Sequence, residues 1–127
     1  MSAEERTGWR DEDYSRWHRT LGPNLPMTDI DSVEYHYSVP VACIETKHMQ
    51  AQEEHIYTAS LRCLENLAAA AELPCFITRY DLDDMPLFHV EPRNPLAEQY
   101  VPEPRYMDEG EYTRFLYALR REPHATH

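Results

Sequence analysis

The sequence predicts a single α/β domain built around a mixed β-sheet. Its length of 127 residues suits one domain. Some segments repeat apolar residues at every second position, which is typical of strands, and others repeat them about every 3.6 positions, which is typical of helices. Their order predicts helix, strand, strand, long helix, strand, strand and helix. The stretch at residues 41–48 begins with VACI, which is apolar on both faces and typical of a central, covered strand. This order indicates a sheet flanked by helices.

The first predicted element is a short amphipathic helix at residues 11–21, after a polar segment, residues 1–9, that we expect to be disordered. Tyr14, Trp17 and His18 recur at helical spacing and form its apolar stripe. We expect Trp17 in the core and Arg19 on the surface. A glycine-proline pair ends the helix.

Two strands and a long helix follow. Residues 29–37 alternate and are rich in Ile, Val and Tyr, so they predict a strand that Val39 and Pro40 break. Residues 41–48 form the next strand, with its polar residues gathered at the end. Residues 50–72 predict the longest helix, whose apolar period runs through Ile56, Ser60, Cys63, Leu64, Leu67 and Ala71.

The C-terminal part supplies the remaining elements. Residues 75–80 and 86–90 predict two strands around a turn at 81–84. The proline-rich residues 91–106 predict an extended loop, and residues 112–121 a final helix. Asp108 and Glu111 have the spacing of a reciprocal capping pair at the start of that helix.

Composition narrows the function classes. The formal net charge is −11, which disfavours a uniformly basic nucleic-acid surface. A local basic patch remains open, from Arg10, Arg16, Arg19, Arg62, Arg79 and Arg93. Cys43, Cys63 and Cys75 are odd in number and widely spaced, so we expect three buried thiols and no disulfide framework. No Gly-rich phosphate loop or G-x-S-x-G motif occurs.

No apolar run approaches the ~20 residues of a membrane helix. The acidic N-terminal stretch lacks the apolar region of a signal peptide. We therefore expect a cytoplasmic protein without membrane contact.

The segments TDIDSVEY and ACIETK carry the candidate chemistry. Side chains alternate along a strand, so Glu45 and Lys47 should point to the same side. Asp29 and Asp31 share a side of the preceding strand. In a hairpin, an aspartate and Glu45 would converge, and paired carboxylates suit a Mg²⁺ ion. A nearby lysine would orient a water and stabilise developing charge.

An aspartate, a short hairpin, E-x-K and a long helix resemble the PD-(D/E)XK (restriction-endonuclease-like) nuclease superfamily, in its small bacterial or phage form. The resemblance covers roughly residues 21–80 and implies a sandwich with a mixed sheet flanked by helices. It implies that Asp31, Glu45 and Lys47 are catalytic, with Mg²⁺ (or Mn²⁺) on Asp31, Glu45 and the Thr46 carbonyl. "DIDSVEY" favours Asp31 over Asp29, and Gln52 and Tyr57 do not match the Q-x-x-x-Y motif of the RecB-like branch.

Further candidates are weaker. Asp29 and Glu12 are additional possible metal ligands, and His48 and Arg19 possible substrate contacts. His48 and His55 could share a helix face in a zinc site, although scattered polar histidines are commoner.

Two functions follow from these residues. One is a Mg²⁺-dependent nuclease acting on DNA, with a protein partner or a second copy compensating for small size and acidic charge. The other is an inactive nuclease-like binding or inhibitory protein that uses an acidic surface. E-x-K alone is a short motif that occurs by chance on solvated strands. A basic groove leading to Glu45 would favour the enzyme, and acidic residues all around it would favour the binding protein.

Overall fold

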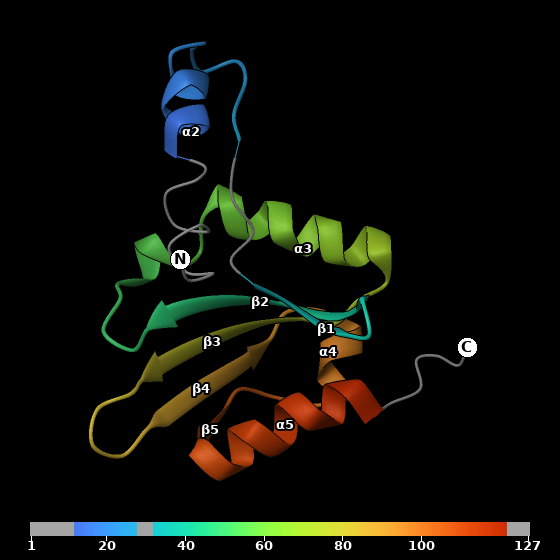
Figure 1. Cartoon of the computed structure of the whole chain (residues 1–127). Helices are drawn as coiled ribbons and strands as arrows, with labels where there is room; N and C mark the ends of the chain where they lie inside the picture. Colours follow the sequence, from blue (N-terminus) through green and yellow to red (C-terminus); the bar gives the residue numbers. More distant parts are fainter. Residues whose placement is uncertain (1–11, 28–31, 122–127) are drawn as a thin grey trace.

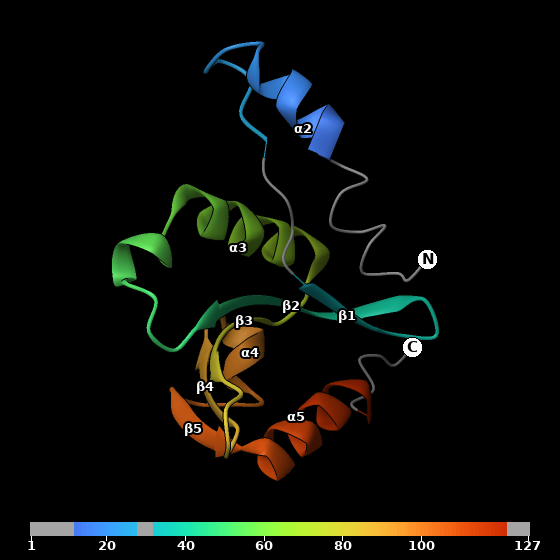
Figure 2. The same cartoon turned by 60° about the vertical axis from the view of Figure 1, so that its left-hand side comes forward.

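The chain forms an α/β domain with an open, five-stranded mixed sheet between helices (Figures 1 and 2). The computed structural model describes residues 12–27 and 32–121, without the side chain of Glu12. The elements are α2 (Glu12–Arg19), β1 (Ser32–His36), β2 (Val39–His48), the 3-10 turn η1 (Glu53–His55), α3 (Ala59–Ala71), β3 (Cys75–Asp81), β4 (Leu87–Pro92), α4 (Pro95–Glu98), β5 (Arg105–Asp108) and α5 (Glu109–Arg121).

The strands lie in the sheet in their order along the chain. β1 and β2 form an antiparallel hairpin, and β2 runs parallel to β3 because α3 crosses between them. β4 and β5 then add in antiparallel fashion. This places β2 and β3 inside the sheet, as expected from the apolar start of β2.

The hairpin turn differs from the predicted position. Tyr37 and Ser38 make the turn with φ angles of 52° and 71°, and β2 already begins at Val39. Positive φ at both central positions suits the twist of a tight hairpin. Pro40 does not break the strand, because it pairs with Tyr35 where the register shifts, and proline is tolerated at such irregularities.

Two apolar cores cover the two faces of the sheet. α5 and α4 cover one face, where Ile44, Phe76 and Val90 meet Phe115 and Leu119 in one cluster. α3 covers the other (Figure 1). Two clusters lie on that face. One joins β2, β3 and α3 through Cys43, Leu64, Ala68 and Cys75. The other joins Ile56, Leu61 and Ile77. Alternation along β2 and β3 divides the side chains between the faces.

The helix predicted at residues 50–72 is shorter than expected, and a different set of its residues is buried. It begins at Ala59, because the Thr58 hydroxyl caps it by accepting a hydrogen bond from Leu61 N at 3.3 Å. The buried positions are Leu61, Leu64 and Ala68. Cys63 is exposed, so the expectation of three buried thiols is wrong for this residue.

The predicted extended loop at 91–106 is wrong in part. It contains the end of β4, the short helix α4 and the start of β5. Asn94 caps α4 by accepting from Ala97 N at 2.9 Å, and Pro95 lies in the first turn, where it suits a helix. α5 begins at Glu109, three residues before the predicted start.

The predicted capping pair of α5 is confirmed. Asp108 N donates to Glu111 Oε1 at 2.9 Å, and Glu111 N donates to Asp108 Oδ1 at 2.8 Å.

α2 lies beyond α3, away from the sheet (Figures 1 and 2). Trp17 is 53% exposed and Tyr14 58% exposed, so the prediction of Trp17 as a core residue is wrong. The helix is amphipathic as expected, yet its apolar stripe does not pack on the sheet. No helix within residues 12–27 and 32–121 is long and apolar enough to cross a membrane.

Candidate functional site

Glu45 is a nearly buried acid at the centre of the sheet. It follows four buried apolar residues of β2 and is itself 7% exposed. Its neighbour across the parallel ladder is Ile77 of β3. Glu45 is the acid buried in the described part of the chain, where Thr78 is the other buried polar residue. A carboxylate in such apolar surroundings needs a compensating charge or a ligand.

Lys47 supplies a charge beside this carboxylate. Its Nζ lies 3.4 Å from Glu45 Oε2, which confirms that the two side chains project from the same side of β2. The lysine is more exposed than its partner, so the pair joins a buried anion to a cation near solvent. Removing either charge would leave the other uncompensated.

The other predicted metal ligands are only partly described. Asp31 and Asp29 lie outside the described residues, and the β1–β2 ladder begins with Ser32 opposite Ile44. Glu12 begins α2, but its side chain is not described. Thr46 is half-buried and pairs with Thr78 in β3, so its backbone belongs to an ordered, central strand.

The two predicted substrate contacts lie in different places. His48 ends β2 with an exposed side chain, next to Lys47 in the chain. Its ring meets Tyr80 edge-on at 5.6 Å, and its Nδ1 accepts from Gln50 N at 3.1 Å. Arg19 ends α2, outside the sheet layers. His48, but not Arg19, therefore belongs to the surroundings of Lys47.

The donor chemistry around Glu45 fits Mg²⁺ in kind. A carboxylate and a backbone carbonyl at Thr46 are oxygen ligands of the type this ion prefers. Residues 12–27 and 32–121 contain no group of three His, Cys, Asp or Glu side chains that could hold a metal. A complete set therefore requires a second carboxylate, for which the sequence offers Asp31 or Asp29. His48 and His55 do not share a helix face, because His48 ends a strand and His55 ends a 3-10 turn.

Arg79 fixes the loop that follows Lys47. It is the ladder partner of Lys47 in β3. Its Nη2 donates to the carbonyls of Met49 at 2.8 Å and Ala51 at 2.9 Å, while its Nε is buried without a hydrogen-bond partner. The guanidinium thus holds the chain just past the E-x-K motif and adds positive charge beside Lys47. Sequence reasoning named Arg79 only as a possible surface cation, because this role depends on the parallel register.

A second acid, Glu91 of β4, lies on the same face of the sheet as Glu45. Glu45 pairs with Ile77, and Ile77 pairs with Glu91, which places both acids on the face under α3. Both Glu91 oxygens are engaged, since Tyr57 OH donates to Oε1 at 2.8 Å and Arg93 Nη1 donates to Oε2 at 2.7 Å. Glu91 is therefore satisfied by its neighbours and does not act as a spare metal ligand.

Arg93 links Glu91 to the helix α3. Its Nε donates to Glu65 at 2.6 Å, and its guanidinium lies 5.4 Å from the centre of the Tyr57 ring. Burial alone would lower the pKa of Arg93, but its hydrogen bonds to Glu65 and Glu91 outweigh this and raise it. Burial and the Glu91 carboxylate raise the pKa of Tyr57. The positive charge of Arg93 is thus neutralised by Glu65 and Glu91 within the fold.

Comparison with known proteins leaves the family open. No family model matches the chain, and no curated protein or solved structure does either.

The basic patch considered from the sequence does not form as one surface. Arg93 is paired with two acids, Arg79 is bonded to backbone carbonyls, and Arg16 is paired with Asp13 at 3.2 Å. Arg10 lies outside the described residues. What remains near Glu45 is a short cationic pair, Lys47 and Arg79, on neighbouring strands.

Proposed function

We propose that the protein is a Mg²⁺-dependent nuclease that hydrolyses DNA phosphodiester bonds, on a restriction-endonuclease-like fold. The observation that carries this proposal is the nearly buried Glu45 held 3.4 Å from Lys47 at the polar end of an otherwise apolar central strand. Structural ion pairs usually lie at surfaces. A buried acid beside a more exposed lysine, at a strand's carboxyl end, is typical of functional sites in α/β sheets.

The order of elements supports the same proposal. A hairpin of β1 and β2 presents E-x-K near its end, and α3 then crosses to a parallel neighbour, β3. The resemblance depends on this order of hairpin, E-x-K strand and helix. Asp31 directly precedes the first described residue of β1 in the chain.

Glu45, Asp31 and the Thr46 carbonyl would hold the metal, with Asp29 and Glu12 as further possible ligands. The chemistry that Mg²⁺ would supply there is polarisation of a phosphoryl oxygen and a lower pKa of a coordinated water. Because Glu45 is fixed in the sheet, little rearrangement is needed to present its carboxylate.

Lys47 has the role of orienting the attacking water and stabilising charge in the transition state. Its ammonium is held by Glu45, and the loop behind it is fixed by Arg79. Arg79 acts as a positioning residue. His48, exposed and next to Lys47, is placed to contact a substrate phosphate.

The test is cleavage of supercoiled and linear DNA with Mg²⁺, Mn²⁺ or EDTA. We expect Glu45→Gln and Lys47→Met each to lower the rate by about 100-fold or more, as is usual for loss of a charge that stabilises the transition state. Glu98→Gln, at an exposed position on α4, is the matched control and should cleave like wild type. Equal rates for all four proteins, with folding checked by circular dichroism, would remove Glu45 and Lys47 from the chemistry.

The acidic surface favours a second candidate, an inactive protein-binding module. Asp83 and Asp84 are exposed in the β3–β4 turn, and the chain has a net charge of −11. Absence of both metal binding and cleavage, with capture of a basic protein that Asp83→Asn and Asp84→Asn weaken, would establish this candidate in place of the nuclease.

A further inference from the structure

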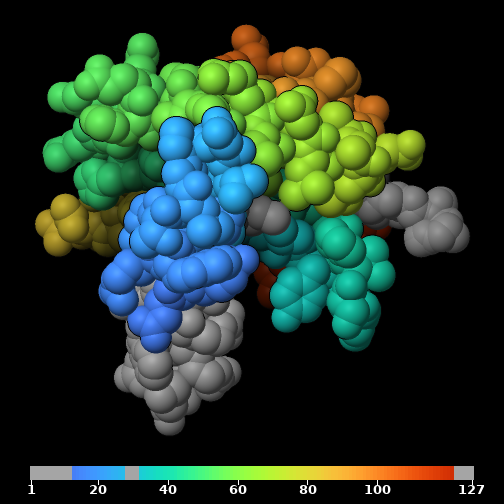
Figure 3. Space-filling model, turned by 90° about the horizontal axis from the view of Figure 1, so that it is seen from above, coloured from blue at the N-terminus to red at the C-terminus, as the bar shows by residue number. Residues whose placement is uncertain are grey.

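α2 and the loop after it form an arm, residues 12–27, that projects from the domain (Figures 1 and 3). In the described part of the chain, the helix is not among the elements that pack closely against one another. The loop is the part that returns to the body, where Pro26 and Met27 line a hollow together with Ala59, Ser60 and Cys63 of α3.

The arm carries a cluster of exposed rings. The centroids of Tyr14 and Trp17 lie 5.5 Å apart, and His18 lies 6.0 Å from Tyr14 and 6.4 Å from Trp17. Both larger rings are more than half exposed. A helix of eight residues is marginal in water without packing of its apolar face. Rings on such a helix are therefore well placed to gain from a ligand that covers them.

Cations are interleaved with these rings. Arg16, His18 and Arg19 form the last turn of α2. Arg16 is 3.2 Å from Asp13, whereas Arg19 has no ion pair among the described residues. The arm thus combines planar rings with two guanidinium groups, in a segment whose formal charge is zero because Glu12 and Asp13 balance Arg16 and Arg19.

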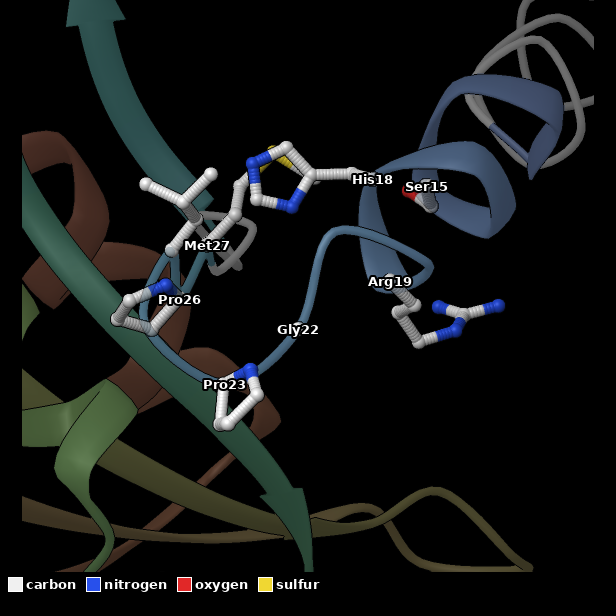
Figure 4. A pocket seen from close by; sticks show the side chains of 8 residues that line it. Ser15, His18, Arg19, Gly22, Pro23, Pro26 and Met27 are labelled. Carbon is white, nitrogen blue, oxygen red and sulfur yellow. The ribbon is translucent and has the colours of Figure 1, made fainter.

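A hollow of about 600 Å³ lies between the helix end and the loop. Ser15, His18 and Arg19 line it from α2, and Gly22, Pro23 and Met27 line it from the loop (Figure 4). The His18 ring extends toward Met27. The volume suits a nucleotide-sized group, and its walls offer a guanidinium, an imidazole and a hydroxyl as hydrogen-bond donors.

We propose that the arm binds an unpaired nucleic-acid strand. Bases stack on Trp17 and Tyr14, and phosphates contact Arg19 and His18. Proteins that hold single strands combine exposed aromatic rings with nearby cations in this way, and each stacked base contributes strongly. An unpaired strand is favoured over a second copy of the chain, because Arg19 and His18, which can contact phosphates, lie on the same helix as the rings on which bases would stack. The inference rests on the proposed nuclease function and names its substrate class.

The test measures binding separately from cleavage. Fluorescein-labelled single-stranded DNA, single-stranded RNA and duplex DNA, each of about 20 nucleotides, are titrated in EDTA and followed by fluorescence anisotropy. We expect single strands to bind more tightly than the duplex. Trp17→Ala should weaken binding about tenfold or more. Arg19→Gln should weaken it and reduce the salt dependence by about one counterion.

Matched controls distinguish the arm from the rest of the surface. Tyr117→Ala and Arg62→Gln remove an exposed ring and an exposed cation elsewhere, and both should bind like wild type. The comparison of DNA with RNA tells which strand the arm holds. No binding by wild type, equal binding by Trp17→Ala, or a preference for duplex would each overturn the proposal. A dimer in sedimentation that Trp17→Ala dissociates would assign the arm to a second copy instead.

Failure of this inference and failure of the nuclease proposal give different results. Glu45→Gln should keep wild-type binding while losing cleavage. Cleavage that survives Trp17→Ala, with unchanged binding, would refute the arm alone. Strand binding by the arm without cleavage under any metal would refute the nuclease alone.

Discussion

The ion-pair network around Arg93 makes a quantitative prediction about stability. Arg93 donates to Glu65 at 2.6 Å and to Glu91 at 2.7 Å, and the exposed fractions of the three side chains are 28%, 22% and 16%. Arg93→Met removes the cation that, among the described residues, both carboxylates contact. Breaking a buried charge pair costs about 3–5 kcal/mol, and partial exposure lowers this, so we expect a loss of about 3 kcal/mol at pH 7.

This loss corresponds to a large shift in melting temperature. With an unfolding entropy of about 2.1 cal/mol/K per residue over 127 residues, 3 kcal/mol lowers Tm by about 11 °C. Circular dichroism with heat and urea measures both quantities.

The control is Arg62→Met, at an exposed position of α3 with no ion pair among the described residues, which should change stability by less than about 0.5 kcal/mol. Equal stabilities of Arg93→Met and Arg62→Met at pH 7 would refute the reasoning.

Three further predictions follow from burial and hydrogen bonding. In native protein, one thiol, that of Cys63, should react rapidly with a disulfide reagent, and all three should react after denaturation; fast labelling of three thiols in native protein would contradict the assigned burial. Burial raises the pKa of Cys75 from 9.0 to about 12. The stability that this thiol contributes is therefore present below pH 9 and falls by about 1.4 kcal/mol per pH unit between about pH 9 and 12. In urea titrations, the free energy of unfolding of Cys75→Ala should fall less steeply with alkaline pH than that of wild type. Arg79→Met leaves the carbonyls of Met49 and Ala51 without their donor and should lower the free energy of unfolding by about 1–3 kcal/mol, and a change below 0.5 kcal/mol would show that the loop does not depend on it.

Elements with strong local patterns could be predicted from the sequence. The apolar start of β2, the strand β3 and the capping pair of α5 are fixed by alternation and by local hydrogen bonds, and these predictions are confirmed. The start of α3 was missed because residues 50–58 contain good helix formers, and only the Thr58 cap marks the boundary. The short elements α4 and β5 were missed because they lie within or beside proline-rich sequence, which is more typical of loops.

The candidate site divides in the same way. Alternation within one strand predicted that Glu45 and Lys47 share a side, and their contact confirms it. The roles of Arg79 and Arg93 depend on the register between β2, β3 and β4, which pairs residues about 30 positions apart in the chain. Local patterns carry no information about such pairing. The place of Asp31 in the site stays a prediction.

Trp17 shows why amphipathic spacing alone is ambiguous. Its position on a helical stripe predicted burial, but α2 lies beyond α3, away from the sheet, and Trp17 is exposed. The same spacing suits a core helix and a helix whose apolar face binds something else. Only the arrangement of α2 beyond α3 separates the two.

We propose that Glu45 belongs to a metal site that cleaves DNA. The most direct measurement is calorimetric titration of Mg²⁺ and Mn²⁺ into wild type and Glu45→Ala, with both proteins assayed on supercoiled and linear DNA in the same buffers. We expect metal binding and cleavage by wild type, with both lost in Glu45→Ala. Wild-type protein that neither binds metal nor cleaves DNA, or a Glu45→Ala protein that does both as well as wild type, would contradict it.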